Sequence, residues 1–288
     1  MKVWLSSGWT RWAVVFVLVV SAVGSLEATQ EVVGDEPPNA SAAVFPLMAD
    51  LASDDVTTRR SATMVLRELG PVAWPAIPAL VEALSDPIMG VRKGAAGALG
   101  GIGPAAEPAI PELIVALSDP HRFVRSWAAM ALSEIGPAAK RAGPEMVHMM
   151  EGDVDNLRGR AWCASALPIL DADPDLAVPA LMRALSNDSS EEVRSVAALS
   201  LEAYESRAAR RGAAMSLSDA LLDAHWKVRG NAACALPEMG ADAEIARSRL
   251  EGALRDETPY VRDCAARALA SLDQRRRPRS FRRPSPLR

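Results

Sequence analysis

The chain has 288 residues, of which 49% are hydrophobic and 24% charged, so it is not disordered as a whole. Its net charge of −4 is unevenly distributed, because residues 27 to 273 hold all 36 acidic side chains and only 23 of the 32 basic ones. The acidic body argues against a nucleic-acid-binding groove.

The N-terminal residues are typical of a secretory signal peptide. Lys2 and Arg11 precede an apolar run from Trp12 to Val23, and Ala22 and Gly24 are small residues suited to a cleavage site. The alternative is a retained N-terminal membrane anchor, although this run would rise only ~18 Å as a helix, against a hydrocarbon core of ~30 Å. We predict a signal peptide over 1–24, a flexible acidic linker over 25–41, and export to the periplasm, the cell envelope or the medium.

Two adjacent segments, which begin at Gly70 and Gly103, align without a gap at a period of 33 residues. Ala follows three residues after an Arg in every copy of the repeat, and Leu follows seven residues after it in all copies but the fourth, where Leu167 lies two residues late. This spacing places the apolar residues on one face of a helix, the second helix of each repeat. The recurring Arg residues are Arg59, Arg92, Arg125, Arg158, Arg194, Arg229 and Arg262.

A turn and a first helix precede each of these second helices. An Asp lies about six residues before most of the Arg residues, where it is expected to cap the second helix and close a tight turn. Pro78 and Pro111 begin apolar stretches that read as first helices, and Gly followed by Pro ends several second helices. Each repeat is therefore predicted to consist of helix, turn, helix and loop.

This pattern resembles the HEAT repeats, in particular the short bacterial kind named after PBS-lyase-like proteins. The resemblance rests on Pro, then Asp eight residues on, then Val-Arg, as in the segments 78–92 and 111–125. It covers residues 42 to 273 in about seven copies, although Met215 replaces the Pro in copy six. It implies an all-α fold, a right-handed α-solenoid with second helices on the concave side. The composition of residues 274–288, with seven Arg, three Pro and no acidic residue, predicts a disordered Arg-rich tail.

The resemblance also implies a ladder of Asp and Arg side chains along the turns. Each Asp can reach the Arg of its own repeat or of a neighbour, and a planar guanidinium can bond a carboxylate and a carbonyl at once. We interpret these residues as structural. The predicted ladder consists of Asp86, Arg92, Asp119, Arg125, Arg158, Asp188, Arg194, Asp223, Arg229, Asp256 and Arg262.

Residues suited to catalysis are scarce. His121, His148 and His225 are not part of His-Glu dipeptides, which a HEAT-type deoxyhypusine hydroxylase uses to hold iron, so we predict no metal and no cofactor. His121 and His225 are read as solvated turn residues. The Gly-rich stretch 94–103 ends a helix, which favours close helix packing over phosphate binding.

Three cysteines, Cys163, Cys234 and Cys264, lie in Ala-rich helical stretches and are interpreted mainly as small packing residues. At least one must be unpaired within the chain, and one disulfide remains open as an alternative. A phycobilin-lyase-like enzyme would need a reactive thiol or an acidic pocket, for which Cys163 and Cys234 are the candidates.

The remaining candidate site is the side of the second helices that faces away from the core. Trp127 and Met130 lie one turn apart and either pack against an adjacent repeat or form a protein-binding hot spot. The predicted partner-binding residues are Arg60, Met64, Lys93, Trp127, Met130 and Arg160.

We therefore expect a monomeric, non-catalytic scaffold that binds an unknown protein partner and no nucleic acid. The alternatives are an enzyme related to the phycobilin lyases or the hydroxylase, and a purely structural spacer in an envelope assembly. The Arg-rich tail could add a weak contact with an anionic surface.

Overall fold

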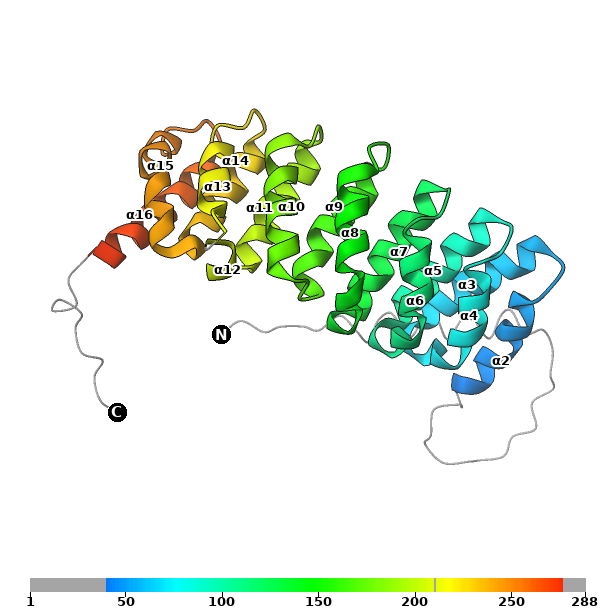
Figure 1. Ribbon diagram of the computed structural model, residues 1–288. Helices are drawn as coiled ribbons and strands as arrows, with labels where there is room; N and C mark the ends of the chain where they lie inside the picture. Colours follow the sequence, from blue (N-terminus) through cyan, green and yellow to red (C-terminus); the bar gives the residue numbers. More distant parts are fainter. Residues whose placement is uncertain (1–39, 210, 277–288) are drawn as a thin grey trace, which may run out of the picture.

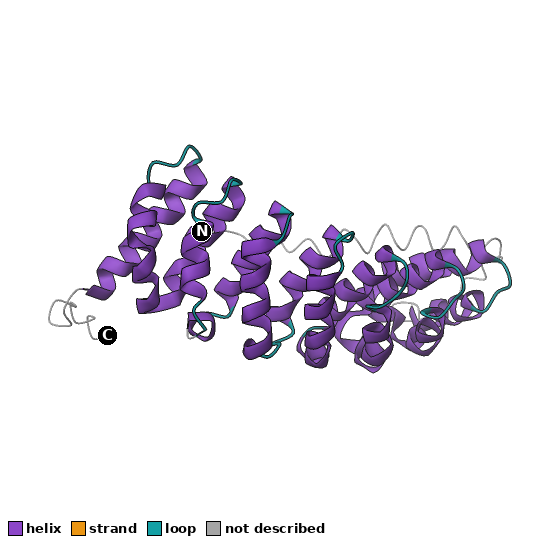
Figure 2. Ribbon diagram, turned by 45° about the horizontal axis from the view of Figure 1, so that its top comes forward, coloured by secondary structure: helices purple, strands orange, loops and turns teal. Residues whose placement is uncertain are grey.

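The computed structural model describes residues 40–209 and 211–276. The predicted signal peptide, nearly all of the linker and most of the Arg-rich tail lie outside these ranges. Within them, helix pairs stack side by side into an elongated array, and the regular structure is helical throughout (Figures 1 and 2). The predicted all-α solenoid is confirmed in this part of the chain.

The array has two rows of helices. The first helices of the repeats are α2 (Ala40–Leu51), α4 (Ile77–Ala83), α6 (Ile110–Ala116), α8 (Gly143–Gly152), α10 (Pro174–Asn187), α13 (Ala213–Ala220) and α15 (Arg247–Ala253). The second helices are α3 (Val56–Leu69), α5 (Met89–Ile102), α7 (Arg122–Ile135), α9 (Leu157–Ile169), α11 (Glu191–Ala203), α14 (Trp226–Ala235) and α16 (Pro259–Arg276). Connections contain η1 (Gly70–Ala76), η2 (Gly103–Ala109), η3 (Pro137–Ala142), η4 (Leu236–Ala246) and the short α12 (Ser206–Ala209).

Glycine ends several second helices, as predicted. Gly70 and Gly103, which follow α3 and α5, have φ angles of 61° and 73°. An L side chain rarely adopts this conformation, and the Pro after each glycine prevents the helix from continuing. The chain then makes a 3-10 turn before it enters the next first helix.

The turn between the two helices of a repeat differs in one detail from the prediction. The carboxylate of Asp119 accepts a hydrogen bond from the backbone N–H of His121 at 2.7 Å, which closes the turn. However, the N-cap of α7 is His121 itself, whose Nδ1 accepts from the backbone N–H of Phe123. The expectation that Asp caps the second helix is therefore wrong for α7, because the N-cap lies two residues beyond Asp119. His225 caps α14 in the same way. In the first repeat an Asp does cap the second helix, since Asp55 accepts from the backbone N–H of Thr58 at the start of α3.

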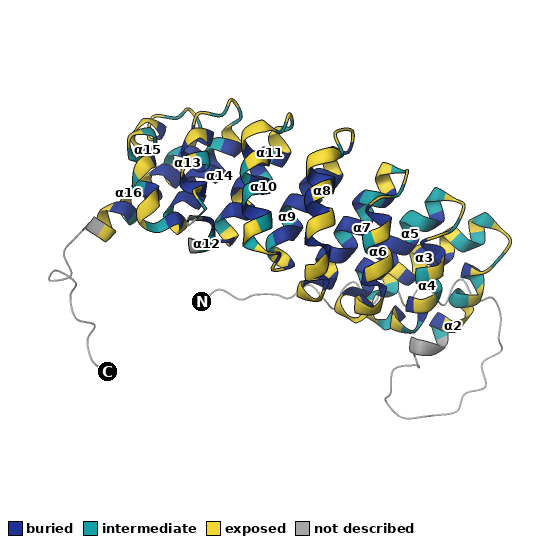
Figure 3. Ribbon diagram, in the orientation of Figure 1, coloured by how far each residue is buried: buried dark blue, intermediate teal, exposed yellow. Residues whose placement is uncertain are grey.

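The core lies between the two rows and consists mostly of Ala, Leu and Val (Figure 3). The predicted stripe is buried, as Val91, Ala95 and Leu99 on α5 show. Successive second helices contact one another more extensively than successive first helices do. Small residues on the second helices, such as Gly94 and Gly97 of α5, permit this close approach.

Within the described residues, the stretch Val56–Ala83 is long and apolar enough to cross a membrane by length and composition alone. It is not one continuous α-helix, because the chain turns at Gly70 and passes through η1 between α3 and α4. Its residues Ala62, Leu66 and Leu80 belong to the core of the array.

Candidate functional site

Arg–Asp pairs join successive repeats along the turns. Arg92 Nε donates to Asp119 Oδ2 at 2.7 Å, Nη2 donates to Asp119 Oδ1 at 3.1 Å, and Nη1 donates to the carbonyl oxygen of Asp86 at 2.9 Å. The guanidinium thus bonds the carbonyl of its own turn and the carboxylate of the next. The pairs are Arg59–Asp86, Arg92–Asp119, Arg125–Asp153, Arg160–Asp188, Arg194–Asp223 and Arg229–Asp256.

The fourth pair corrects two predicted roles. Arg158, expected in the ladder, is exposed, whereas Arg160, expected on the binding surface, is buried and bonds Asp188. The Leu-Arg pair at 157–158 resembles the usual Val-Arg pair, but the ladder Arg of this repeat lies two residues later, at Arg160. The position of Leu167 indicates this shift, because it lies seven residues after Arg160, as the Leu of the other copies lies seven residues after the ladder Arg. At the other end, Arg262 bonds the carbonyls of Asp256 and Glu257 in its own turn.

The ladder also changes the acidity of its members. Burial alone would raise the pKa of Asp119, but hydrogen bonds from Arg92 and from the backbone of His121 outweigh it, and the pKa is lowered. The same balance lowers the pKa of Asp153 and Asp223. The hydrogen bond to Asp119 raises the pKa of Arg92. Both partners of the pair therefore remain charged at neutral pH.

Trp127 connects three successive second helices. Its ring lies over Gly97 of α5, where a Cβ atom would come within 2.9 Å of the ring. The guanidinium carbon of Arg67 on α3 lies 4.9 Å from the ring centroid. A Cβ at Gly94 would collide with Thr63 in a similar way, so the glycines of α5 serve close packing, as predicted. The structure thus shows Trp127 packed against the adjacent repeat.

The other predicted surface residues differ in accessibility. Met64 on α3 is 66% exposed, and Arg60 is exposed beside it. Lys93 and Met130 are half-buried on α5 and α7. We use the name inner patch for a set of six residues on these three helices. The inner patch consists of Arg60, Met64, Arg67, Lys93, Trp127 and Met130.

Charge on the second helices differs between the first four of them and α11. Outside the ladder, α3, α5, α7 and α9 carry five basic side chains and two acidic ones. In contrast, α11 carries three acidic side chains and no basic one besides its ladder Arg. The inner patch therefore lies in a basic part of a chain whose body is acidic.

The candidate catalytic residues do not converge. Among residues 40–209 and 211–276, no three His, Cys, Asp or Glu side chains form a group that could hold a metal ion. His148 is exposed on α8. Cys163 is fully buried, and burial raises the pKa of its thiol. Cys234 and Cys264 form a disulfide, the alternative that the sequence left open.

The stacked helix pairs and their Arg–Asp ladder define a helical repeat protein. Residues 91–119 match the family model for the PBS lyase HEAT-like repeat, and residues 109–139 match the model for the HEAT repeat. The resemblance to HEAT repeats is therefore confirmed. No curated protein matches the sequence.

Solved structures show the same fold. An engineered protein is 21% identical, with a TM-score of 0.60, over 80% of this chain and 68% of its own. The complex of CpcE and CpcF of phycocyanin lyase from Nostoc sp. PCC7120 includes a chain that is 23% identical, with a TM-score of 0.50, over 87% of this chain and 99% of its own.

Proposed function

We propose that this chain is an exported, non-catalytic scaffold that binds a protein partner through the inner patch. The observation that carries the proposal is the exposure of Met64 at 66% between the basic side chains of Arg60 and Arg67. Large apolar side chains flanked by arginine are typical of binding hot spots.

The charge of the inner patch selects the chemistry of the partner. Its charged members, Arg60, Arg67 and Lys93, are all basic. Because the patch is also apolar at Met64, it fits an acidic protein segment that contains large apolar side chains. Opposite charges of this kind accelerate encounter and exclude basic competitors.

The packing of Trp127 supports this role. Arg67 lies over the ring, and the absence of a side chain at Gly97 permits the ring to approach α5 closely. A binding surface whose side chains are already ordered loses less conformational entropy when a partner docks. Trp127 therefore serves as an ordered member of the inner patch, held against Arg67 of the helix that also bears Met64.

The disulfide between Cys234 and Cys264 supports export, because such bonds persist in oxidising compartments. Together with the signal-peptide pattern of residues 1–24, it favours a periplasmic, envelope or secreted location. The burial of Cys163 removes one of the two thiols that a lyase-like reaction could use, and the disulfide engages the other.

Two synthetic peptides of equal length test the proposal, one with alternating Glu and Leu and one with alternating Lys and Leu. We expect fluorescence anisotropy to show binding of the acidic peptide only, with an affinity that falls as salt is added. Met64→Ala should weaken this binding without a change in melting temperature.

Val115→Ala is the matched control, because Val115 is 74% exposed on α6 in the opposite row. It should leave binding unchanged. Equal binding of the basic peptide, or full binding by the Met64 variant, would refute the proposed surface.

A further inference from the structure

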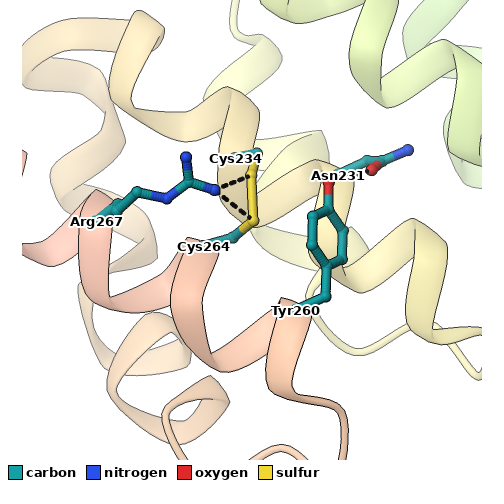
Figure 4. The surroundings of a disulfide bond; sticks show 5 residues. All are labelled: Asn231, Cys234, Tyr260, Cys264 and Arg267. Atoms are coloured by element: carbon teal, nitrogen blue, oxygen red, sulfur yellow. Dashed lines mark hydrogen bonds between the residues drawn. A yellow bond between two sulfur atoms is a disulfide. The ribbon is translucent and has the colours of Figure 1, made fainter. Parts of the chain in front are cut away.

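Cys234 on α14 and Cys264 on α16 form a disulfide between two neighbouring second helices (Figure 4). Cys264 is fully buried, whereas Cys234 is half-buried. The two sulfurs therefore differ in access, and Cys234 is the member of the pair that a reagent from solvent can reach.

Arg267 lies one turn beyond Cys264 on α16, and its guanidinium faces the disulfide (Figure 4). Its Nη2 atom is 3.1 Å from the Sγ atom of Cys234 and 3.1 Å from that of Cys264. The positive charge of Arg267 also acts on Glu202 of α11. Burial and the charge of Glu238 raise the pKa of Glu202, and Arg267 opposes them.

A cation beside a sulfur atom favours the thiolate over the thiol. In thiol–disulfide exchange, one sulfur of the disulfide leaves as a thiolate, and it leaves faster when its thiol is more acidic. Arg267 is thus placed to stabilise the sulfur that departs. A disulfide that served only as a structural cross-link would not need a guanidinium in contact with both sulfurs.

We propose that Cys234 and Cys264 form a thiol–disulfide exchange site that reacts with an external dithiol, with Arg267 stabilising the Cys264 thiolate as leaving group. The thiolate of the dithiol attacks Cys234 Sγ, the S–S bond breaks, and its electron pair leaves on Cys264 Sγ. The second thiol of the reagent then loses its proton and attacks the reagent sulfur that is bound to Cys234, the mixed disulfide breaks, and its electron pair leaves on Cys234 Sγ. The dithiol becomes a disulfide with the loss of two electrons, and the two cysteines gain these electrons and two protons.

The position of the bond gives the reaction a structural consequence. Within the described residues, the repeat of α15 and α16 has a neighbouring repeat on one side only, so its stability depends on a single interface. Reduction removes the covalent link between α16 and α14 and leaves α16 on packing and hydrogen bonds alone. The exchange site therefore controls how firmly the last repeat is attached.

The full-length oxidised protein tests the order of attack. With glutathione as a monothiol probe, followed by alkylation and peptide mass spectrometry, we expect glutathione on Cys234 and the alkyl label on Cys264. Glutathione mainly on Cys264 would overturn the assignment, as would finding both thiols free in protein purified without reductant.

The rate of reduction by dithiothreitol tests Arg267. Arg267→Met should slow the reaction about three- to tenfold, whereas Arg267→Lys should retain most of the rate. Arg255→Met, at an exposed arginine in the turn before α16, is the control and should react as the wild type does. Equal rates for Arg267→Met and wild type would contradict the proposal.

The buried Cys163 reports on unfolding in the same experiment. It should stay unlabelled while Cys234 and Cys264 react. Labelling of all three cysteines at one rate would show that exchange requires global unfolding and would overturn the proposed site.

Discussion

The guanidinium of Arg160 holds the carboxylate of Asp188 through two hydrogen bonds, from Nε to Oδ2 at 2.9 Å and from Nη2 to Oδ1 at 3.0 Å. The side chains are 6% and 9% exposed, so both charges lie largely out of water. Two further bonds from Nη1 reach the carbonyls of Asp153 and Val154. A single side chain therefore connects the turns of two repeats.

Arg160→Ala should destabilise the protein by about 3 to 5 kcal/mol, because it leaves the Asp188 carboxylate buried without its cation. Arg158→Ala, two residues away on an exposed site, is the matched control and should cost less than ~0.5 kcal/mol. Urea unfolding followed by circular dichroism measures both. A small effect at Arg160 would mean that water replaces the guanidinium.

The ladder also predicts how stability depends on pH. The pKa of Asp119 is lowered in the folded chain, so the unfolded state binds more protons as the solution becomes acidic. The stabilisation is fully present above the unfolded pKa of about 4 and is lost as pH falls through the lower folded value. Urea midpoints between pH 7 and pH 2.5 should therefore decline below pH 4.

Asp119→Asn should be less stable than wild type at pH 7 and should show a shallower decline in acid. Asp242→Asn, at an exposed residue of η4, should leave the decline unchanged. If the two variants have the same acid dependence, the ladder carboxylates do not control it.

The period of the sequence was sufficient to predict the solenoid, because the Arg, Ala and Leu positions share one helical face in every copy but the fourth. It was not sufficient in the fourth copy, where the Leu-Arg pair at 157–158 pointed to Arg158, whereas the spacing to Leu167 indicates Arg160. The closed turn at Asp119 was predicted, but the cap at His121 was not, since both residues are polar and only backbone geometry separates their roles.

Contacts between repeats were the hardest feature to predict. Gly97 lies five residues after its ladder Arg and touches Trp127, two residues after the next one. Cys234 and Cys264 occupy the same two positions in the last two repeats, where they are joined as a disulfide. The repeat spacing was therefore consistent with the Cys234–Cys264 pairing. It could not predict the pairing, because the sequence does not show that these two positions of neighbouring repeats are in contact.

Gly97→Ala tests the fit under Trp127. A Cβ at this position would lie 2.9 Å from the ring, so the ring must shift even though alanine favours helix. We expect changed tryptophan fluorescence and no gain in stability. Gly252→Ala on α15, where nothing lies within 4 Å, should instead stabilise by up to ~1 kcal/mol.

The disulfide makes a separate contribution to stability. It closes a loop of 30 residues, and the loss of chain entropy in the unfolded state corresponds to about 3 to 4 kcal/mol at 25 °C. The double variant Cys234→Ser/Cys264→Ser should therefore lose stability by this amount under oxidising conditions. Wild type in excess reductant should behave like the variant, because both lack the bond.

The location of this loss of stability shows whether the disulfide stabilises only the repeats near it or the whole array. In a repeat array each repeat is stabilised by its neighbours, so faster amide exchange in the double variant should be largest in α15 and α16 and fade toward α9. Hydrogen exchange with mass spectrometry measures this gradient. Equal acceleration in α3 and α16 would mean that the described repeats unfold as one cooperative unit, in which the bond at the end supports every repeat alike.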